Sequence, residues 1–374
     1  MTKSELFRFI GKCLALDENP GFRAELIEKC RNNEVDWNQF VGLCSNHLIL
    51  PAIHLKFLSH GIVGFIPEDL AKHLSIIYEL NVARNGEILT QIGQISALLS
   101  SNNIHPIFIK GAAFLIDGLL SNVGERILGD IDFLVPEKDY LQSAKILENS
   151  GYRIVETLRA YDRIESMKHY PRLEHPDFVA SVEIHRIPVN VECVSWFNTE
   201  LIDREKKSVE SISGCFVQSD KHKIIQNFIH SQLSNEGFLF GVVSLRELND
   251  LYLLSKRASL SESMREIKTK QKAIAYFAYS RKLLGLGESF FSLKNSAYQI
   301  LSTKHTLNLN SSVFYHSLRS SIFIVQRVVN GYIGQIVLAF FSGEKRQYLY
   351  RRIKDRKWYG DHFRLYTRFF KGKK

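Results

Sequence analysis

The sequence predicts an α+β protein, with a mixed β-sheet core between two mostly helical segments. From residue 104 to residue 190, short apolar runs rich in β-branched residues alternate with helical runs and are separated by glycine, proline and aspartate. Outside that stretch, apolar residues recur every three or four positions, the spacing of helices that bury one face. A chain of 374 residues can bury a core of this size and form two or three subdomains.

We expect four segments. An N-terminal helical domain occupies residues 1–103, the α/β core residues 104–190, a second helical domain residues 191–342 and a basic aromatic tail residues 343–374. The hydrophobic content of 45% is that of a soluble globular protein. Scattered cysteines and an N-terminus without a long apolar run favour a cytoplasmic protein. Polar residues interrupt the apolar stretch 322–341, so we do not expect it to cross a membrane.

The net charge of +10 is concentrated in the tail. Residues 343–374 contain 12 Lys and Arg against 3 Asp and Glu, which is about +9, and aromatic residues stand among them. Such a segment suits an acidic partner, which is a membrane surface, a nucleic acid or an acidic protein. It also suits a helical subdomain with a solvated basic face. A peripheral membrane contact through the tail is therefore one expectation beside the cytoplasmic location.

The N-terminal domain is expected to consist of capped, amphipathic helices. Asp36 precedes a helix and is followed three residues later by Gln39, which is the spacing of a capping box. A long helix is predicted over residues 67–99, because its apolar residues recur at helical spacing. Within this helix Arg84 and Asn85 are candidates to face a cleft, but an exposed helix face is the simpler expectation.

Regular elements follow one another through the core. Gly151 stands just after a predicted helix, where a left-handed C-cap favours glycine. The run Glu174–Asp177 contains proline and aspartate, so it predicts the turn of a hairpin. In chain order we expect a strand over 105–110, a helix after Gly111, a strand over 130–135, a helix over 137–150, a strand over 152–157, and hairpin strands over 168–173 and 178–187.

Two further helices are predicted after residue 220. Asp220 caps the first, which carries an apolar stripe with His230 beside it. The second carries leucines at helical spacing, namely Leu245, Leu248, Leu251 and Leu254. Arg246 and Asp250 stand four residues apart in that helix. They form either an intrahelical ion pair or part of a substrate site.

Two carboxylates stand on the strand that begins at residue 130. Asp130 and Asp132 are two residues apart, and side chains alternate along a strand, so both point to one face. Neighbouring carboxylates repel each other and lose hydration on an apolar strand, and Mg²⁺ removes that cost because it prefers oxygen ligands. The alternative is a solvated turn with a helix-capping aspartate.

Two additions favour a phosphate and metal site. Lys110 and Gly111 stand at a strand-to-helix turn, where glycine lets backbone N–H groups approach a phosphate. A third acid, Glu183, lies on another predicted strand and on its more polar face, together with His185. Three carboxylates on adjacent strands could converge on one site.

These motifs together resemble a known family. They are the strand that runs into Lys110 and Gly111, the run Arg126–Val135 with its Gly-Asp-Ile-Asp block, and the run Glu183–His185. The combination is similar to the polymerase-β-like nucleotidyltransferases, and more narrowly to a bacterial family described as uncharacterised nucleotidyltransferases. The resemblance extends over residues 36–256.

The resemblance implies a polymerase-β-like core and an Mg²⁺-dependent transfer of a nucleoside monophosphate from an NTP to an acceptor, with release of pyrophosphate. The implied catalytic and metal-binding residues, which would hold two Mg²⁺ ions, are Asp130, Asp132 and Glu183. The implied nucleotide-binding residues are Lys110, Gly111 and Arg126, although Lys110 is also placed to pair with a carboxylate. Around them, His185, Arg246 and Asp250 are candidates to support the site. A small molecule, a sugar, a protein and a nucleic acid are all compatible acceptors.

Other classes have less support. The chain lacks Gly-x-Gly-x-x-Gly, Gly-x-Ser-x-Gly and His-Glu-x-x-His, so dinucleotide-binding, α/β-hydrolase and zinc-protease interpretations have no motif. The alternative of another class is a non-catalytic nucleotide-binding or interaction module with the same fold. The acids Asp130, Asp132 and Glu183 argue against it, because a binding module has no need of a costly acidic cluster.

Overall fold

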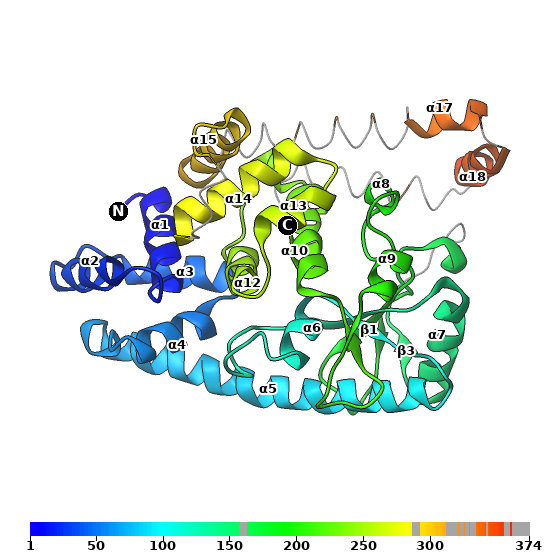
Figure 1. The fold of residues 1–374 in the computed structure, drawn as a ribbon, viewed down its shortest axis with the longest axis horizontal. Helices are drawn as coiled ribbons and strands as arrows, with labels where there is room; N and C mark the ends of the chain where they lie inside the picture. Colours follow the sequence, from blue (N-terminus) through cyan, green and yellow to red (C-terminus); the bar gives the residue numbers. More distant parts are fainter. Residues whose placement is uncertain are drawn as a thin grey trace. The chain divides into compact units, whose positions relative to one another are not determined.

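The computed structural model describes residues 1–156, 163–285, 292–311, 334–341 and 343–354, with the single positions 321, 325, 329 and 360. These residues belong to two compact units. Unit 1 comprises Met1–Glu156 and Met167–Asn310, and unit 2 comprises Thr157–Ser166 and Ser311–Lys374. Unit 1 contains a seven-stranded mixed sheet and many helices, which confirms the α+β class (Figure 1).

The sheet has the strand order β3-β4-β5-β2-β1-β7-β6. Two of its neighbouring pairs are parallel, β2 with β5 and β1 with β7, and the other pairs are antiparallel. The central strands β1, β2 and β5 are almost wholly buried. The strand bounds are β1 Ile107–Phe108, β2 Asp130–Leu134, β3 Arg153–Ile154, β4 Leu173–Glu174, β5 Ser181–His185, β6 Lys207–Ser208 and β7 Phe216–Val217.

Five helices precede the sheet, and the last of them is the long helix that the sequence predicts. Asp36 caps its helix as expected, because its side chain accepts a hydrogen bond from the Gln39 backbone N–H at 3.0 Å. The longest, α5, extends along unit 1 from α4 to the region of α7 and β3 (Figure 1). The bounds are α1 Lys3–Leu14, α2 Pro20–Arg31, α3 Trp37–Asn46, α4 Leu50–Ser59 and α5 Glu68–Ser100.

Helices α6 (Lys110–Ile116) and α7 (Tyr140–Asn149) connect the strands of the core. Gly151, after α7, has a φ of 101°, so the predicted left-handed position is confirmed. Each predicted strand overlaps an observed strand, and the observed strands are shorter. The prediction of a strand over 168–173 is wrong for most of its length, because β4 contains only Leu173 of that range and continues into Glu174. Strands β6 and β7 were not predicted, because two-residue strands carry no detectable alternation.

The second half of unit 1 is helical. The four predicted leucines of α12 are all buried, and His230 lies in a π-helical turn over Ile229–Ser234. Aromatic side chains pack α10 against α14, since Phe228 contacts both Tyr276 and Phe277. The helix bounds are α8 Val191–Val194, α9 Thr199–Arg204, α10 Asp220–Phe228, α11 Gly237–Phe240, α12 Leu245–Ser255, α13 Leu260–Glu266, α14 Lys270–Leu284 and α15 Ser296–Asn310.

Unit 2 contains helices α17 (Gly334–Phe341) and α18 (Gly343–Lys354). Arg346 donates hydrogen bonds to the carbonyl oxygens of Ala339 and Phe340, which ties α18 to the end of α17. Among the described residues, no helix is both long enough and apolar enough to span a membrane. Most of the predicted tail after Lys354 lies outside the described residues.

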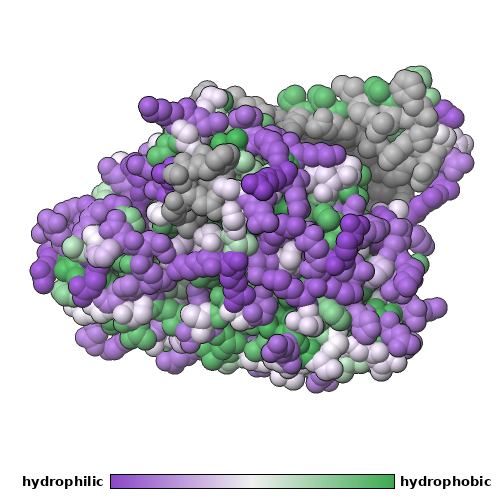
Figure 2. Space-filling view, in the orientation of Figure 1, coloured by the Kyte–Doolittle hydropathy of each residue, from purple (hydrophilic) through white to green (hydrophobic). Residues whose placement is uncertain are grey.

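The surface of the protein is mostly hydrophilic on the face shown in Figure 2, with hydrophobic residues gathered along its lower edge, where α5 runs. Two exposed apolar residues of α5 are Ile76 and Leu80. In unit 2, Phe340 is 75% exposed and Ile353 is 64% exposed. Isolated exposed apolar residues are ordinary, whereas in unit 2 they occur together with basic charge.

Candidate active site

Strands β2 and β5 bring two of the predicted acids together. The strands are parallel and in register, with Asp132 opposite Glu183 and Leu134 opposite His185. Opposite residues of neighbouring strands point to the same face, so the two carboxylates lie side by side. Both side chains are buried, which makes their charges costly unless cations or hydrogen bonds compensate them.

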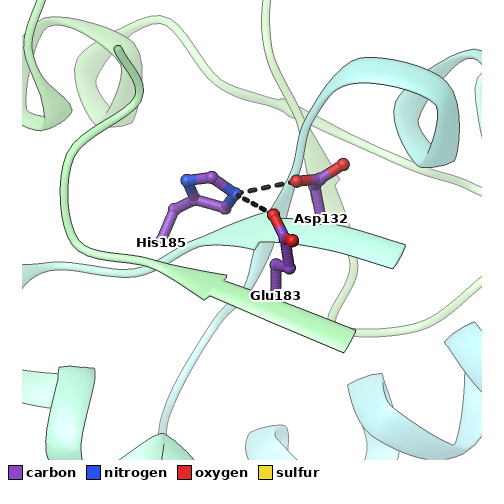
Figure 3. A group of neighbouring side chains, drawn as sticks. All are labelled: Asp132, Glu183 and His185. Carbon is purple, nitrogen blue, oxygen red and sulfur yellow. Dashed lines mark hydrogen bonds and ion pairs between the residues drawn. The ribbon is translucent and has the colours of Figure 1, made fainter. Parts of the chain in front are cut away.

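His185 joins the two acids (Figure 3). Its Nε2 atom lies 2.7 Å from Oδ1 of Asp132 and 3.6 Å from Oε2 of Glu183. One ligand atom from each of the three residues lies within 4.8 Å of the others. Carboxylate oxygens and an imidazole nitrogen are ordinary ligands of divalent metals. Among the described residues this is the group of three whose geometry fits a metal ion.

Asp130 lies outside that group. It is on the same face of β2, two residues before Asp132, and its side chain is 36% exposed. Burial raises its pKa, and the neighbouring charge of Asp132 raises it further. The sequence hypothesis places Asp130, Asp132 and Glu183 in one cluster, whereas the structure puts His185 in the buried group and Asp130 at its rim.

Arg172 was not identified from the sequence. Its Nη2 atom lies 2.8 Å from Oε1 of Glu183 and 3.9 Å from Oδ2 of Asp130, so it bridges the rim and the buried group. Burial opposes ionisation of Glu183, but hydrogen bonds from His185 and Arg172 outweigh it and lower its pKa to about 2. The pairing of Leu173 with Val182 places Arg172 opposite Glu183, and only the strand register shows this.

Lys110 pairs with a carboxylate, which is one of the two alternatives drawn from the sequence. It follows β1 with a φ of 54°, and its Nζ atom lies 2.5 Å from Oδ1 of Asp132. Burial alone would lower its pKa, but the charge of Asp132 outweighs burial and raises it. For Asp132 the same attraction and the contact with His185 overcome burial and hold its pKa well below the usual range.

Gly111 and Arg126 also come together. A Cβ atom on Gly111 would lie 2.4 Å from Nη1 of Arg126, so a side chain at this position would require the guanidinium to move. The other side of the guanidinium is occupied, since Nε and Nη2 of Arg126 donate to Asp250 at 2.8 and 2.9 Å. Burial would lower the pKa of Arg126, but the charge of Asp250 outweighs it. Asp250 thus positions Arg126 against the Gly111 turn.

Two asparagines of α5 hold the loop that carries Arg126. Nδ2 of Asn81 donates to the carbonyl oxygens of Gly124 and Arg126, and Nδ2 of Asn85 donates to those of Val123 and Arg126. The expectation that Asn85 lies on an exposed helix face is wrong, because its side chain is fully buried. The spacing of four between Asn81 and Asn85 on one helix face was the signal that could have found them.

Asp250 pairs with Arg126, and no ion pair joins it to Arg246 among the described residues. The buried Nε of Arg246 has no hydrogen-bond partner among the described residues. Burial lowers the pKa of Arg246, and the charge of Arg126 lowers it further. His230 is bonded to Glu247 at 2.8 Å, as a satisfied histidine would be.

Comparison with known proteins agrees with the motifs. The comparison with curated proteins finds no match to the chain. A family model described as "Uncharacterised nucleotidyltransferase" matches residues 33–285, which is more than half of the chain and includes the whole sheet and every residue of the site described above. The chain therefore belongs to this family of uncharacterised nucleotidyltransferases.

Proposed function

We propose that the protein is an Mg²⁺-dependent nucleotidyltransferase with a polymerase-β-like core. The observation that carries the proposal is the in-register pair Asp132 and Glu183, two buried acids beside the Lys110–Gly111 turn. In the reaction, an acceptor oxygen or nitrogen forms a bond to the α-phosphorus of an NTP. The bond from that phosphorus to the bridging oxygen of pyrophosphate breaks, and the acceptor loses a proton.

Asp132 and Glu183 would hold Mg²⁺, with Asp130 completing a second position from the rim. The donor set fits, because a cluster of buried carboxylates needs positive charge and Mg²⁺ takes oxygen ligands. Bound Mg²⁺ would neutralise triphosphate charge and polarise the phosphorus under attack. His185 lies on the same face of the sheet as the two carboxylates and would orient them. Lys110 and Arg172 balance part of the negative charge of the cluster.

Gly111 and Arg126 would contact the triphosphate. Gly111 is buried and has no side chain, and Nη1 of Arg126 lies beside its backbone, so the two groups would meet a phosphate together. An anion at this turn would accept bonds from both, while Asp250 keeps the guanidinium in place. Arg246, which has no carboxylate partner among the described residues, would add positive charge on the same side.

The alternative function is a non-catalytic module of the same fold. One observation favours it: Lys110 and Arg172 already pair with the acids, so the cluster is partly neutral without a metal. Release of pyrophosphate separates the two functions. The protein would be incubated with Mg²⁺, each NTP and acceptors of each class, including the protein itself. A transferase releases pyrophosphate and a Glu183→Gln variant does not, whereas a binding module releases none in either form.

We also propose the four-segment organisation, with the α/β core at 104–190, and a role in location for the basic tail. The described part of the tail supports this role, because α18 has five basic residues against one acid. Exposed apolar residues stand on the same unit, namely Ile336, Val337, Phe340, Tyr350 and Ile353. Basic and apolar groups together suit an anionic surface, and the protein would otherwise work in the cytoplasm.

A further inference from the structure

Among the described residues, Lys110, Arg172 and Lys168 interact with the buried acids Asp132 or Glu183, and the first two form ion pairs with them. Lys110 pairs with Asp132 at 2.5 Å, and Arg172 pairs with Glu183 at 2.8 Å. The third is Lys168, which lies on the segment that leads into β4. Among the described residues, no carboxylate forms an ion pair with Lys168, whose ammonium bonds the neutral amide of Asn190, so an incoming anion could use this ammonium as well.

The backbone places Lys168 at the end of β5. Its carbonyl oxygen accepts hydrogen bonds from the backbone N–H groups of Arg186, at 3.0 Å, and Ile187, at 3.3 Å. The next residue, His169, forms an antiparallel bridge with His185, and the two rings are 5.3 Å apart. Lys168 thus lies on the segment that pairs with the end of β5, where His185 stands, and His185 is one of the three residues of the candidate metal site.

The side chain of Lys168 is half-buried, and Nζ donates to Oδ1 of Asn190 at 3.3 Å. Burial lowers the pKa of Lys168, and repulsion from Lys110 lowers it further, while Asp132 and Glu183 act in the opposite direction. The ammonium therefore experiences both the cations and the acids of the site. A partly desolvated ammonium with one neutral partner is unfavourable until an anion joins it.

We propose that Lys168 binds a phosphate oxygen of the nucleotide. This proposal rests on the proposed function, in which the acids hold Mg²⁺ and the triphosphate binds together with it. It adds to Gly111 and Arg126 a contact from the segment that is hydrogen-bonded to the residues just after β5. Asn190 holds the amine in place before the nucleotide arrives.

The test compares binding of two ligands to the full-length protein, with Mg²⁺ present throughout. Isothermal titration measures the affinity of the NTP that binds best, chosen from ATP, GTP, CTP and UTP, and that of the corresponding nucleoside, which has no phosphate. Lys168→Met should weaken NTP binding on the order of ten- to a hundredfold, because a charge-assisted hydrogen bond is lost. Nucleoside binding should not change, and Lys168→Arg should restore part of the NTP affinity.

The matched control is Lys145→Met, which removes the same charge from the exposed face of α7 and should leave both affinities unchanged. Wild-type NTP affinity in Lys168→Met would overturn the proposal, as would an equal loss for the nucleoside, which indicates a structural role. If Lys168→Met does not fold, Lys168→Gln takes its place. A wild-type protein that binds no Mg²⁺-NTP would refute the proposed function itself, and the role of Lys168 with it.

Discussion

Asp132 and Glu183 stand directly opposite each other on the parallel neighbours β2 and β5, although 51 positions separate them in the chain. This register places two buried acids side by side, and His185 and Lys110 contact the same oxygen of Asp132. Because each acid is compensated by a neighbour, the site exists as a folded arrangement before any ligand binds.

The ion pair of Arg126 and Asp250 should be important for stability. Both groups are buried, so Arg126→Ala leaves an unpaired carboxylate and should lower the free energy of unfolding by about 3–5 kcal/mol. Urea denaturation measures the loss. The double variant Arg126→Met with Asp250→Leu removes both charges and should recover most of it. A loss below about 1 kcal/mol in Arg126→Ala would show that solvent screens the pair.

Gly111 should not accept a side chain. Gly111→Ala puts a Cβ 2.4 Å from Nη1 of Arg126, and the guanidinium must move from its place beside Asp250. We expect the free energy of unfolding, measured by thermal melting, to fall by about 1–3 kcal/mol. Gly129→Ala is the matched control, because no atom outside its chain neighbours lies within 4 Å of a Cβ there. Equal losses in both variants would contradict the close approach.

The parts of the site that the sequence predicts are those set by local pattern. Alternation along each strand predicts the face on which Asp132 and Glu183 lie, and the Lys110–Gly111 turn follows from a strand that runs into a helix. That the two acids stand opposite each other is a property of the strand register. Membership of the nucleotidyltransferase family is confirmed. The four-segment organisation and the roles of the site residues stay predictions.

The parts that the sequence did not show depend on tertiary contacts. Arg126 and Asp250 are 124 positions apart, and the spacing of Asp250 with Arg246 pointed to a different partner. Arg172 and Lys168 lie in the stretch 168–173, which the sequence predicts as a strand but which is mostly irregular, so the alternation of a strand does not indicate which face their side chains take. Asn85 is polar but buried, because it bonds backbone carbonyls of a loop that the sequence does not place against α5.

Stability should fall as the pH falls from about 6.5 to about 4. Burial lowers the pKa of His47 and of His305 to about 4, so between these values the unfolded chain binds protons that the folded chain does not. The contribution of each neutral buried histidine to the free energy of unfolding is fully present above pH ~6.5. It amounts to on the order of 3 kcal/mol for each histidine and is lost as the pH falls toward about 4.

Thermal melting across this range checks the slope. His305→Gln removes one titrating group, and the change of stability with pH should become smaller. His73→Gln, which alters an exposed histidine of α5, is the control. If His305→Gln melts with the wild-type dependence on pH, the buried neutral histidine is not the cause.

The tail should attach the protein to anionic lipid vesicles at low salt and release it as salt rises. Phe340→Ser with Ile353→Ser removes two exposed apolar groups of unit 2 without changing its charge, so vesicle sedimentation should decrease. Leu58→Ser, which changes an exposed leucine of α4, is the control. Equal binding by the double variant and by Leu58→Ser would assign attachment to charge alone. If the wild type binds neither vesicles nor RNA at low salt, the tail is only a packed basic helix and does not attach the protein.

We expect Asp132 and Glu183 to bind Mg²⁺ together with a nucleoside triphosphate. The most direct measurement is calorimetric titration of wild-type and Asp132→Asn protein with each NTP, with and without Mg²⁺. Asp132→Asn keeps the side-chain shape but removes the charge that Mg²⁺ and Lys110 need, so we expect slightly lower stability and no Mg²⁺-dependent binding. The wild type should bind at least one NTP only when Mg²⁺ is present. If Asp132→Asn and the wild type bind the NTP with equal Mg²⁺-dependent affinity, Asp132 does not hold the metal and the proposed site is wrong.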